Sequence, residues 1–182
     1  MNLRDVLARI DGLLKRCGIE YAVIGGYAVA AWGEVRATRD IDLLCGAEDL
    51  DTLKHALTES GVHFEHRVGD PDDPISDVVR IELGESGELY ELDVLFGIRE
   101  APAGILERSR PVQIQDLTIP VASPEDTIIL KLLGGSARDI DDARSVLSTQ
   151  RGRIDLSLIR QLCPEPHKPI LERLVKPEAT HP

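Results

Sequence analysis

Aromatic side chains are scarce in this 182-residue chain, at 3% of all residues. Hydrophobic residues nevertheless reach 42%, which is enough for a buried core and argues against a wholly disordered chain. The core must therefore be aliphatic, built from Leu, Ile, Val and Ala. The length suits one compact domain, or one domain with a small helical part attached.

Cysteine is also sparse, and Cys17, Cys45 and Cys163 stand far apart, without metal-ligand spacing. An odd, scattered set argues against a disulfide framework and against zinc. No apolar run approaches the ~20 residues that a membrane span needs, and the N-terminus lacks the basic-then-apolar layout of a signal peptide. We therefore expect a cytoplasmic protein with no membrane association.

Basic residues are outnumbered, since 21 Lys and Arg face 32 Asp and Glu, for a net charge of −11. A broad surface for duplex DNA is thereby disfavoured, because phosphate affinity comes mainly from clustered Lys and Arg. A local basic groove remains compatible with this charge. The acid excess has two interpretations: a solvated surface, or acids that converge on a cation.

The order of expected elements defines the fold class. Residues 2–18 have helical spacing, 21–24 and 39–44 resemble strands, 48–60 a helix, 78–96 a hairpin, 112–121 one or two strands, and 123–134, 137–149 and 154–162 helices. The tail from residue 164 is expected to be irregular. This order predicts an α/β (α+β) protein, with a mixed sheet flanked by helices in residues 1–122 and a helical C-terminal part, 123–182, packed on that core.

Asp40 and Asp42 stand two apart on an expected strand, so both carboxylates leave the same face. At ~4 Å, two unit charges repel by about 1 kcal/mol in water and about 4 kcal/mol at an effective dielectric of 20. A positive partner is therefore expected, and a hard divalent cation prefers such oxygen ligands. The alternative is a solvated face of an edge strand. The same spacing recurs on expected helices or in a loop, at Asp49/Asp51, Asp70/Asp72 and Asp139/Asp141.

Asp93 lies between Leu92 and Val94 in a strongly strand-like segment. The other residues on its face, Glu91 and Leu95, make that face mixed, so a solvated hairpin is the alternative interpretation. If this strand pairs beside residues 39–44, the three aspartates meet. Three carboxylates would then hold one or two Mg²⁺ or Mn²⁺ ions, with phosphate oxygens and water completing the shell.

Gly25 and Gly26 stand between an expected strand and an Ala-rich, helix-favouring segment. Glycine allows backbone N–H groups to approach a phosphate, and a helix N-terminus favours negative charge. A glycine pair alone fits an ordinary tight turn better than a phosphate site. Its interest comes from the aspartates that follow it.

Taken together, the glycine pair, the sequence Arg-Asp-Ile-Asp-Leu-Leu at residues 39–44 and the strand Asp93 resemble the nucleotidyltransferase superfamily, the DNA polymerase beta-like group. Residues 123–132, Ser-Pro-Glu-Asp-Thr-Ile-Ile-Leu-Lys-Leu, followed by Ala137-Arg138-Asp139 and Asp142, narrow the resemblance. They are similar to small prokaryotic nucleotidyltransferase-like proteins of the abortive-infection toxin type. The resemblance covers about residues 20 to 148.

The resemblance implies an active site with metal-bound nucleoside triphosphate (NTP) as substrate. Asp40 and Asp42 would ligate the metal that carries the triphosphate, and Asp93 would complete a second metal site and help activate the acceptor hydroxyl. The glycines and Lys131 would contact phosphate. The implied set is Asp40, Asp42 and Asp93 for metal and catalysis, and Gly25, Gly26, Arg39 and Lys131 for the nucleotide. For Arg39 a solvated cation, and for Lys131 a surface helix lysine, are the alternatives.

Three functions follow as hypotheses. The first is a Mg²⁺-dependent enzyme that transfers a nucleoside monophosphate from an NTP to an acceptor hydroxyl on a protein, a tRNA or a small molecule. The second is a non-catalytic nucleotidyltransferase-like binding protein, such as a toxin–antitoxin component with a partner encoded by an adjacent gene. The third is a structural acidic protein, which predicts that the three aspartates do not converge.

Overall fold

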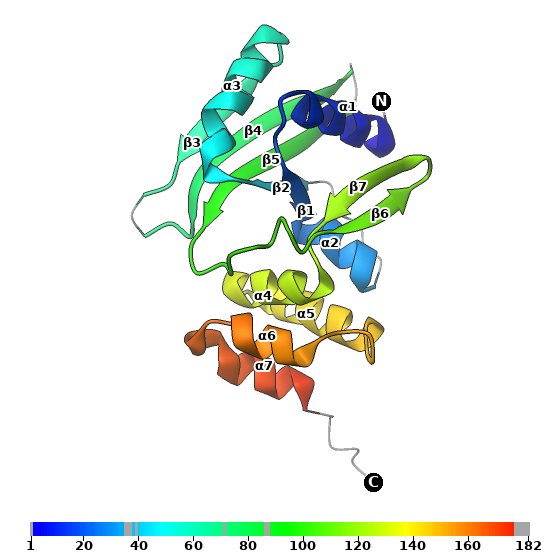
Figure 1. Cartoon of the computed structure of the whole chain (residues 1–182), viewed down its shortest axis with the longest axis vertical. Helices are drawn as coiled ribbons and strands as arrows, with labels where there is room; N and C mark the ends of the chain where they lie inside the picture. Colours follow the sequence, from blue (N-terminus) through cyan, green and yellow to red (C-terminus); the bar gives the residue numbers. More distant parts are fainter. Residues whose placement is uncertain (1, 35–37, 39, 71, 86–87, 177–182) are drawn as a thin grey trace.

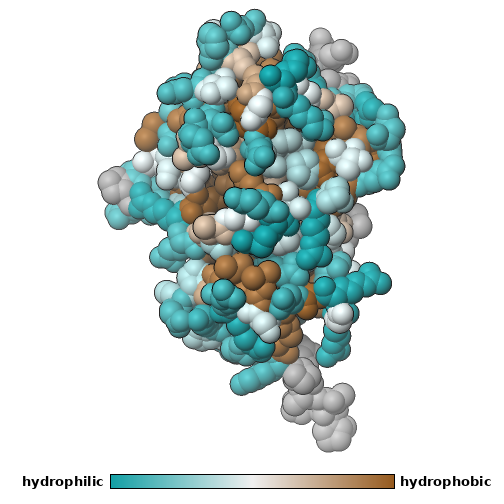
Figure 2. Space-filling model, viewed as in Figure 1, coloured by the Kyte–Doolittle hydropathy of each residue, from teal (hydrophilic) through white to brown (hydrophobic). Residues whose placement is uncertain are grey.

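The computed structural model describes residues 2–34, 38, 40–70, 72–85 and 88–176. Arg39, expected at the nucleotide, lies outside the described residues. Figure 1 shows a sheet with α1 and α3 beside it at one end, and the C-terminal helices stacked at the other end of the long axis. Figure 2 shows this face as mostly hydrophilic, with several hydrophobic areas, one of which lies over the C-terminal helices.

The described elements follow one another in an order close to the expected one. They are α1 (Leu3–Arg16), β1 (Tyr21–Ile24), α2 (Gly25–Trp32), β2 (Ile41–Cys45), η1 (Ala47–Asp49), α3 (Leu50–Glu59), β3 (Phe64–Val68), β4 (Ile75–Glu85), β5 (Glu88–Ile98), β6 (Arg110–Ile114), β7 (Leu117–Val121), α4 (Pro124–Gly134), α5 (Ala137–Thr149), α6 (Leu156–Leu162), η2 (Glu165–His167) and α7 (Lys168–Val175). Residues 112–121 thus contain parts of two strands, not one.

All described strands join one mixed sheet in the order β3-β4-β5-β2-β1-β7-β6. The central strands β2 and β5 run parallel, as do β1 and β7, and the remaining neighbours run antiparallel. β4 and β5 form the hairpin that the sequence predicts. The parallel pairing of β5 with β2 confirms that the strand of Asp93 lies beside the strand of Asp42.

The two faces of the central strands have different neighbours because side chains alternate along a strand. One face carries an aliphatic core that α1 and α3 cover, with Leu43 and Val94 among its buried residues. The opposite face carries a smaller cluster that includes Ile24, Leu44 and Leu95. Asp42 and Asp93 belong to this second face, because they alternate with Leu44 and Leu95 along their strands.

The C-terminal helices form a third cluster, and α2 contributes to it. Buried residues of α4, α5, α6 and α7 pack there with Val29 of α2. Trp32 at the end of α2 donates from its indole Nε1 to the carbonyl of Ala122, at 2.7 Å. The helical part is therefore anchored to the sheet through α2 and through the junction between β7 and α4.

Two sequence expectations require correction. The tail was expected to be irregular from residue 164, but α7 forms there because Ile170, Leu171 and Leu174 fall on one face that packs on the helical core. Asp40 was expected within a strand, but β2 begins at Ile41, so Asp40 precedes the strand and is exposed. Among the described helices, none combines the length and the apolar character needed to cross a membrane.

Candidate active site

A row of paired residues crosses the centre of the sheet. Arg80 on β4 pairs with Asp93 on β5, Asp93 pairs with Asp42 on β2, and Asp42 pairs with Ile24 on β1. Neighbouring strands lie about 5 Å apart, and directly paired residues point to the same face. Asp42 and Asp93 are therefore adjacent, as expected if their strands pair, and this argues against a protein in which the acids stay apart.

Asp42 lies where ionisation is costly. Burial raises the pKa of its carboxyl to about 6, and repulsion from Asp93 and then from Asp40 acts in the same direction. Lys131 and Arg80 lower this pKa without offsetting those causes. Within the described part of the chain, no side chain or backbone N–H donates a hydrogen bond to this carboxylate. A cation at Asp42 would relieve both the burial and the repulsion, so this residue fits a metal ligand.

Gly25 is the first residue of α2 and lies directly against Asp42. Its φ is +63°, and a Cβ atom built there would overlap Oδ2 of Asp42. Any other residue would therefore be strained by the backbone and displaced by the carboxylate. At Gly26 the same construction brings a Cβ within 2.7 Å of the Thr38 hydroxyl. Gly25 therefore allows the N-terminus of α2 to approach the aspartate that would hold the metal, and Gly26 allows it to approach Thr38.

Asp93 already has a partner in this structure. Arg80 donates to it from Nε at 2.8 Å and from Nη2 at 2.7 Å, a bidentate ion pair that uses both carboxylate oxygens. The sequence analysis missed Arg80. Within the described residues, no group of three His, Cys, Asp or Glu side chains could hold a metal ion as they stand. Asp42 therefore fits a cation better than Asp93 does.

Lys131 on α4 faces the same space but is held by acids. Its Nζ lies 2.8 Å from Asp139 and 3.0 Å from Asp142, both on α5. Asp139 also caps the start of α5 together with Ser136. The ammonium group has three donors, so two carboxylates leave one donor for a ligand. Lys131 is thus a positioned cation and not a solvated surface lysine.

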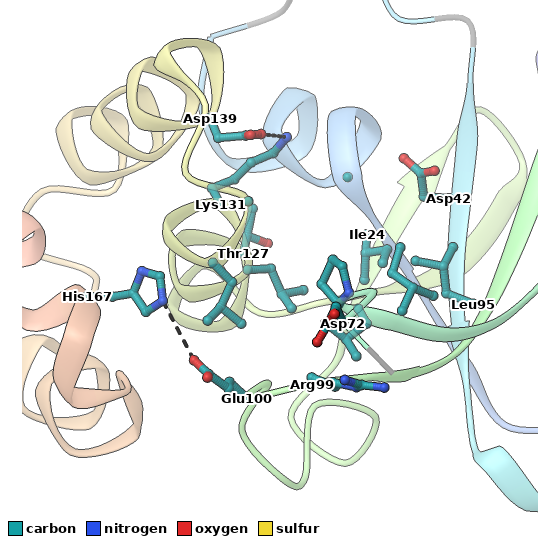
Figure 3. A pocket seen from close by; sticks show the side chains of 17 residues that line it. Ile24, Asp42, Asp72, Leu95, Arg99, Glu100, Thr127, Lys131, Asp139 and His167 are labelled. Carbon is teal, nitrogen blue, oxygen red and sulfur yellow. Dashed lines mark hydrogen bonds and ion pairs between the residues drawn. The ribbon is translucent and has the colours of Figure 1, made fainter. Parts of the chain in front are cut away.

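A cavity of about 610 Å³ connects these groups. Asp42 and Ile24 line one side, and Lys131 and Asp139 lie across it, as Figure 3 shows. Gly25 also lines the cavity. A second polar group lies on the cavity wall, where His167 is 3.8 Å from Glu100. Apolar side chains form much of the wall between the two polar groups. The apolar wall residues are Ile24, Ile75, Leu95, Ile98, Leu130 and Leu133.

Comparison with solved structures identifies the fold as that of nucleotidyltransferases. An antigenic nucleotidyltransferase-like protein from Paracoccidioides brasiliensis is 22% identical, with a TM-score of 0.64 over 95% of this chain and 87% of that one. ANT(2")-Ia in complex with adenylyl-2"-tobramycin is 18% identical, with a TM-score of 0.62 over 93% of this chain and 97% of that one. At such identities the likeness concerns the fold alone.

Sequence similarity gives the family. Residues 3–175 match the family described as nucleotidyl transferase of unknown function (DUF2204), and the chain belongs to that family. The match extends over both the sheet and the C-terminal helices. No curated protein sequence matches the chain.

Proposed function

We propose that this protein is a metal-dependent nucleotidyltransferase that moves a nucleoside monophosphate from an NTP to an acceptor hydroxyl. The observation that carries the proposal is the buried Asp42, which lies beside Asp93 and against Gly25 at the N-terminus of α2. An NTP substrate agrees with the cytoplasmic location expected from the sequence. The class of reaction depends on positioning and on neutralising charge more than on covalent chemistry by the protein.

Each residue of the site has a defined part in this proposal. Asp42, together with Asp40, would hold Mg²⁺ or Mn²⁺, which when bound neutralises charge on the triphosphate. The backbone at Gly25 and Gly26 would donate to phosphate oxygens, because the N–H groups of the first helical turn lack partners within the helix. Lys131 would donate to the leaving pyrophosphate, and Arg39 would add a further cation near the nucleotide.

The acceptor is proposed to be a small molecule. The cavity volume of about 610 Å³ and its apolar wall are typical of sites for small ligands. The net charge of −11 disfavours a tRNA. ANT(2")-Ia, which shares the fold, was solved in complex with an adenylylated antibiotic, and this supports the same class of acceptor.

Labelled NTPs test the proposal. The protein is incubated with each NTP, Mg²⁺ or Mn²⁺, and a cell extract that is then separated into small molecules, RNA and protein. We expect label in the small-molecule fraction, and none with the variant Asp40→Asn/Asp42→Asn. The matched control, Asp49→Asn/Asp51→Asn, changes an acid pair of the same spacing outside the cavity and should label normally. Equal labelling by both double variants would refute the proposal.

The alternative of a binding protein with a separate partner has one supporting observation. A groove of about 860 Å³ between α5, α6 and α7 has an aliphatic floor and is rimmed by Arg144, Arg151, Arg173 and Lys176, without a carboxylate among its lining residues. In a chain of charge −11, such a groove suits an acidic amphipathic helix. Co-expression with the product of an adjacent gene tests it: Arg151→Glu/Arg173→Glu should lose the complex, and retention would refute it.

A further inference from the structure

The ion pair between Arg80 and Asp93 lies next to Asp42 on the sheet, because Asp93 on β5 pairs directly with Asp42 on β2. The side chains are only 30% and 21% exposed, and the guanidinium meets the carboxylate through two parallel hydrogen bonds. Hydrogen bonding to Asp93 raises the pKa of Arg80 above its ordinary value, so its charge is permanent. A partly buried, bidentate ion pair of this kind is more stable than an ion pair between exposed side chains.

This ion pair conflicts with a metal ligand role for Asp93. Both of its oxygens already accept hydrogen bonds from Arg80. A cation bound there would lie next to a guanidinium that cannot lose its proton. In a two-metal site the ions lie ~3.5–4 Å apart, so the second ion would have to displace Arg80 from a partly buried position.

The charges of the site favour the same conclusion. Asp40, Asp42 and Asp93 carry three negative charges, and Arg80 balances one of them. One divalent cation balances the remaining two. Lys131 adds no positive charge to this balance, because it pairs with two carboxylates, Asp139 and Asp142 on α5. A second divalent cation would leave the protein side of the site with a positive excess before substrate arrives.

We propose that the Arg80 guanidinium takes the place of a second metal ion, so that this protein binds one divalent cation, at Asp42 with Asp40. Arg80 is then a positioning residue, which fixes the orientation of the Asp93 carboxylate and neutralises it. Asp93 contributes to the site through this pair and not as a metal ligand. The inference rests on the proposed function, because that function places a cation at Asp42.

The number of bound Mn²⁺ ions per chain tests the inference without any turnover. Mn²⁺ alone is the probe, and electron paramagnetic resonance of the free ion gives the stoichiometry. We expect one Mn²⁺ for the wild type and two for Arg80→Gln, in which Asp93 is released. Arg67→Gln is the matched control, because Arg67 is an exposed arginine of β3 that pairs with the exposed Glu65, and this variant should bind one Mn²⁺.

A second variant keeps the test decisive if Arg80→Gln folds poorly. Arg80→Gln/Asp93→Asn replaces the ion pair by a neutral pair of similar shape and leaves the net charge of the site unchanged. We expect it to bind one Mn²⁺ with wild-type affinity, whereas loss of a true ligand would weaken binding by about tenfold or more. Circular dichroism of each variant verifies folding.

The outcomes separate this inference from the proposed function. A wild type that binds two Mn²⁺ ions, or a double variant whose affinity falls tenfold, overturns the inference and leaves the proposed function intact. A wild type that binds no Mn²⁺ contradicts the proposed function itself. If Arg80→Gln folds and still binds only one Mn²⁺ ion, then Arg80 is not what prevents a second ion from binding, and the inference is wrong.

Discussion

At the scale of single residues, Gly25 and Asp42 depend on each other. The positive φ at Gly25 and the closeness of the Asp42 carboxylate are two separate costs for any side chain there. Gly61 has the same φ of +63°, but a Cβ at that position would meet nothing within 4 Å. Comparing Gly25 with Gly61 therefore separates the cost of the contact with Asp42 from the cost of the left-handed backbone conformation.

The first prediction compares Gly25→Ala with Gly61→Ala. Gly61→Ala should lower the free energy of unfolding by roughly 1 kcal/mol, the cost of a left-handed conformation for an L-residue. Gly25→Ala should cost a further 1–3 kcal/mol or so, as overpacking does. Urea denaturation measures both. In Gly25→Ala/Asp42→Ala most of the additional cost should disappear, and equal losses for the two single variants would contradict the contact.

The second prediction concerns the raised pKa of Asp42. The folded pKa of about 6 exceeds the ordinary aspartate pKa of 3.8, so the folded state binds the proton more tightly than the unfolded state does. Ionisation of Asp42 therefore destabilises the folded state as pH rises from about 4 to 6. In EDTA at pH 7, Asp42→Asn should therefore be more stable than the wild type, by up to roughly 3 kcal/mol before allowance for solvent.

This gain should shrink towards pH 4, where the wild-type carboxyl is protonated in the folded state. Thermal unfolding at the two pH values measures it. Asp51→Asn, which changes an exposed acid outside the cavity, is the control and should show no gain. A less stable Asp42→Asn at pH 7 would mean that Asp42 is stabilised by its surroundings, and would argue against an acid that lacks a cation.

Sequence reasoning predicted the hairpin but missed Arg80, because the partner of Asp93 depends on the register of the two strands. In the structure Glu85 pairs with Glu88, and this register brings Arg80 opposite Asp93. The pairing of Asp42 with Asp93 was expected only on the condition that β5 lies beside β2. No local pattern decides which strands become neighbours when they are separated by about fifty residues, because that choice depends on packing across the whole sheet.

At the scale of elements, the start of α4 joins the sheet domain to the site. Ser123 caps the helix as the sequence predicts, and Pro124 stands in its first turn. The sequence also placed acids near the positive helix end, but it did not reveal that both Glu125 and Asp126 are buried. Arg108 and Arg110, which precede β7 in the chain, pair with these two buried acids. The local sequence around α4 does not show that these arginines lie against it.

The third prediction tests this junction. Asp126 is fully buried and pairs with Arg108 at 2.7 Å. Asp126→Asn should lower the free energy of unfolding by about 3 kcal/mol, because it leaves a charged partner uncompensated. Because α4 carries Lys131, nucleotide binding should weaken as well. Asp116→Asn, which breaks an exposed pair with Arg4, is the control for denaturation and should show no measurable change.

At the scale of the whole molecule, the division into residues 1–122 and 123–182 does not imply two independent units. Val29 of α2 belongs to the cluster of the C-terminal helices. Trp32 donates to Ala122, and Gln150 of the helical part donates in turn to the Trp32 carbonyl, at 2.7 Å. The cavity itself is lined by both parts, since Asp42 comes from the sheet and Lys131 from α4. The site therefore exists only while the two parts are packed together.

The fourth prediction follows from this shared packing. Trp32 is the one tryptophan of the chain, so its fluorescence reports on the junction, whereas far-UV circular dichroism reports on all helices and strands. If sheet and helices unfold as one cooperative unit, both signals should change with the same urea midpoint and the same slope. A fluorescence change that precedes the loss of circular dichroism would show instead that the helical part separates first, and would predict loss of nucleotide binding in that same range of urea.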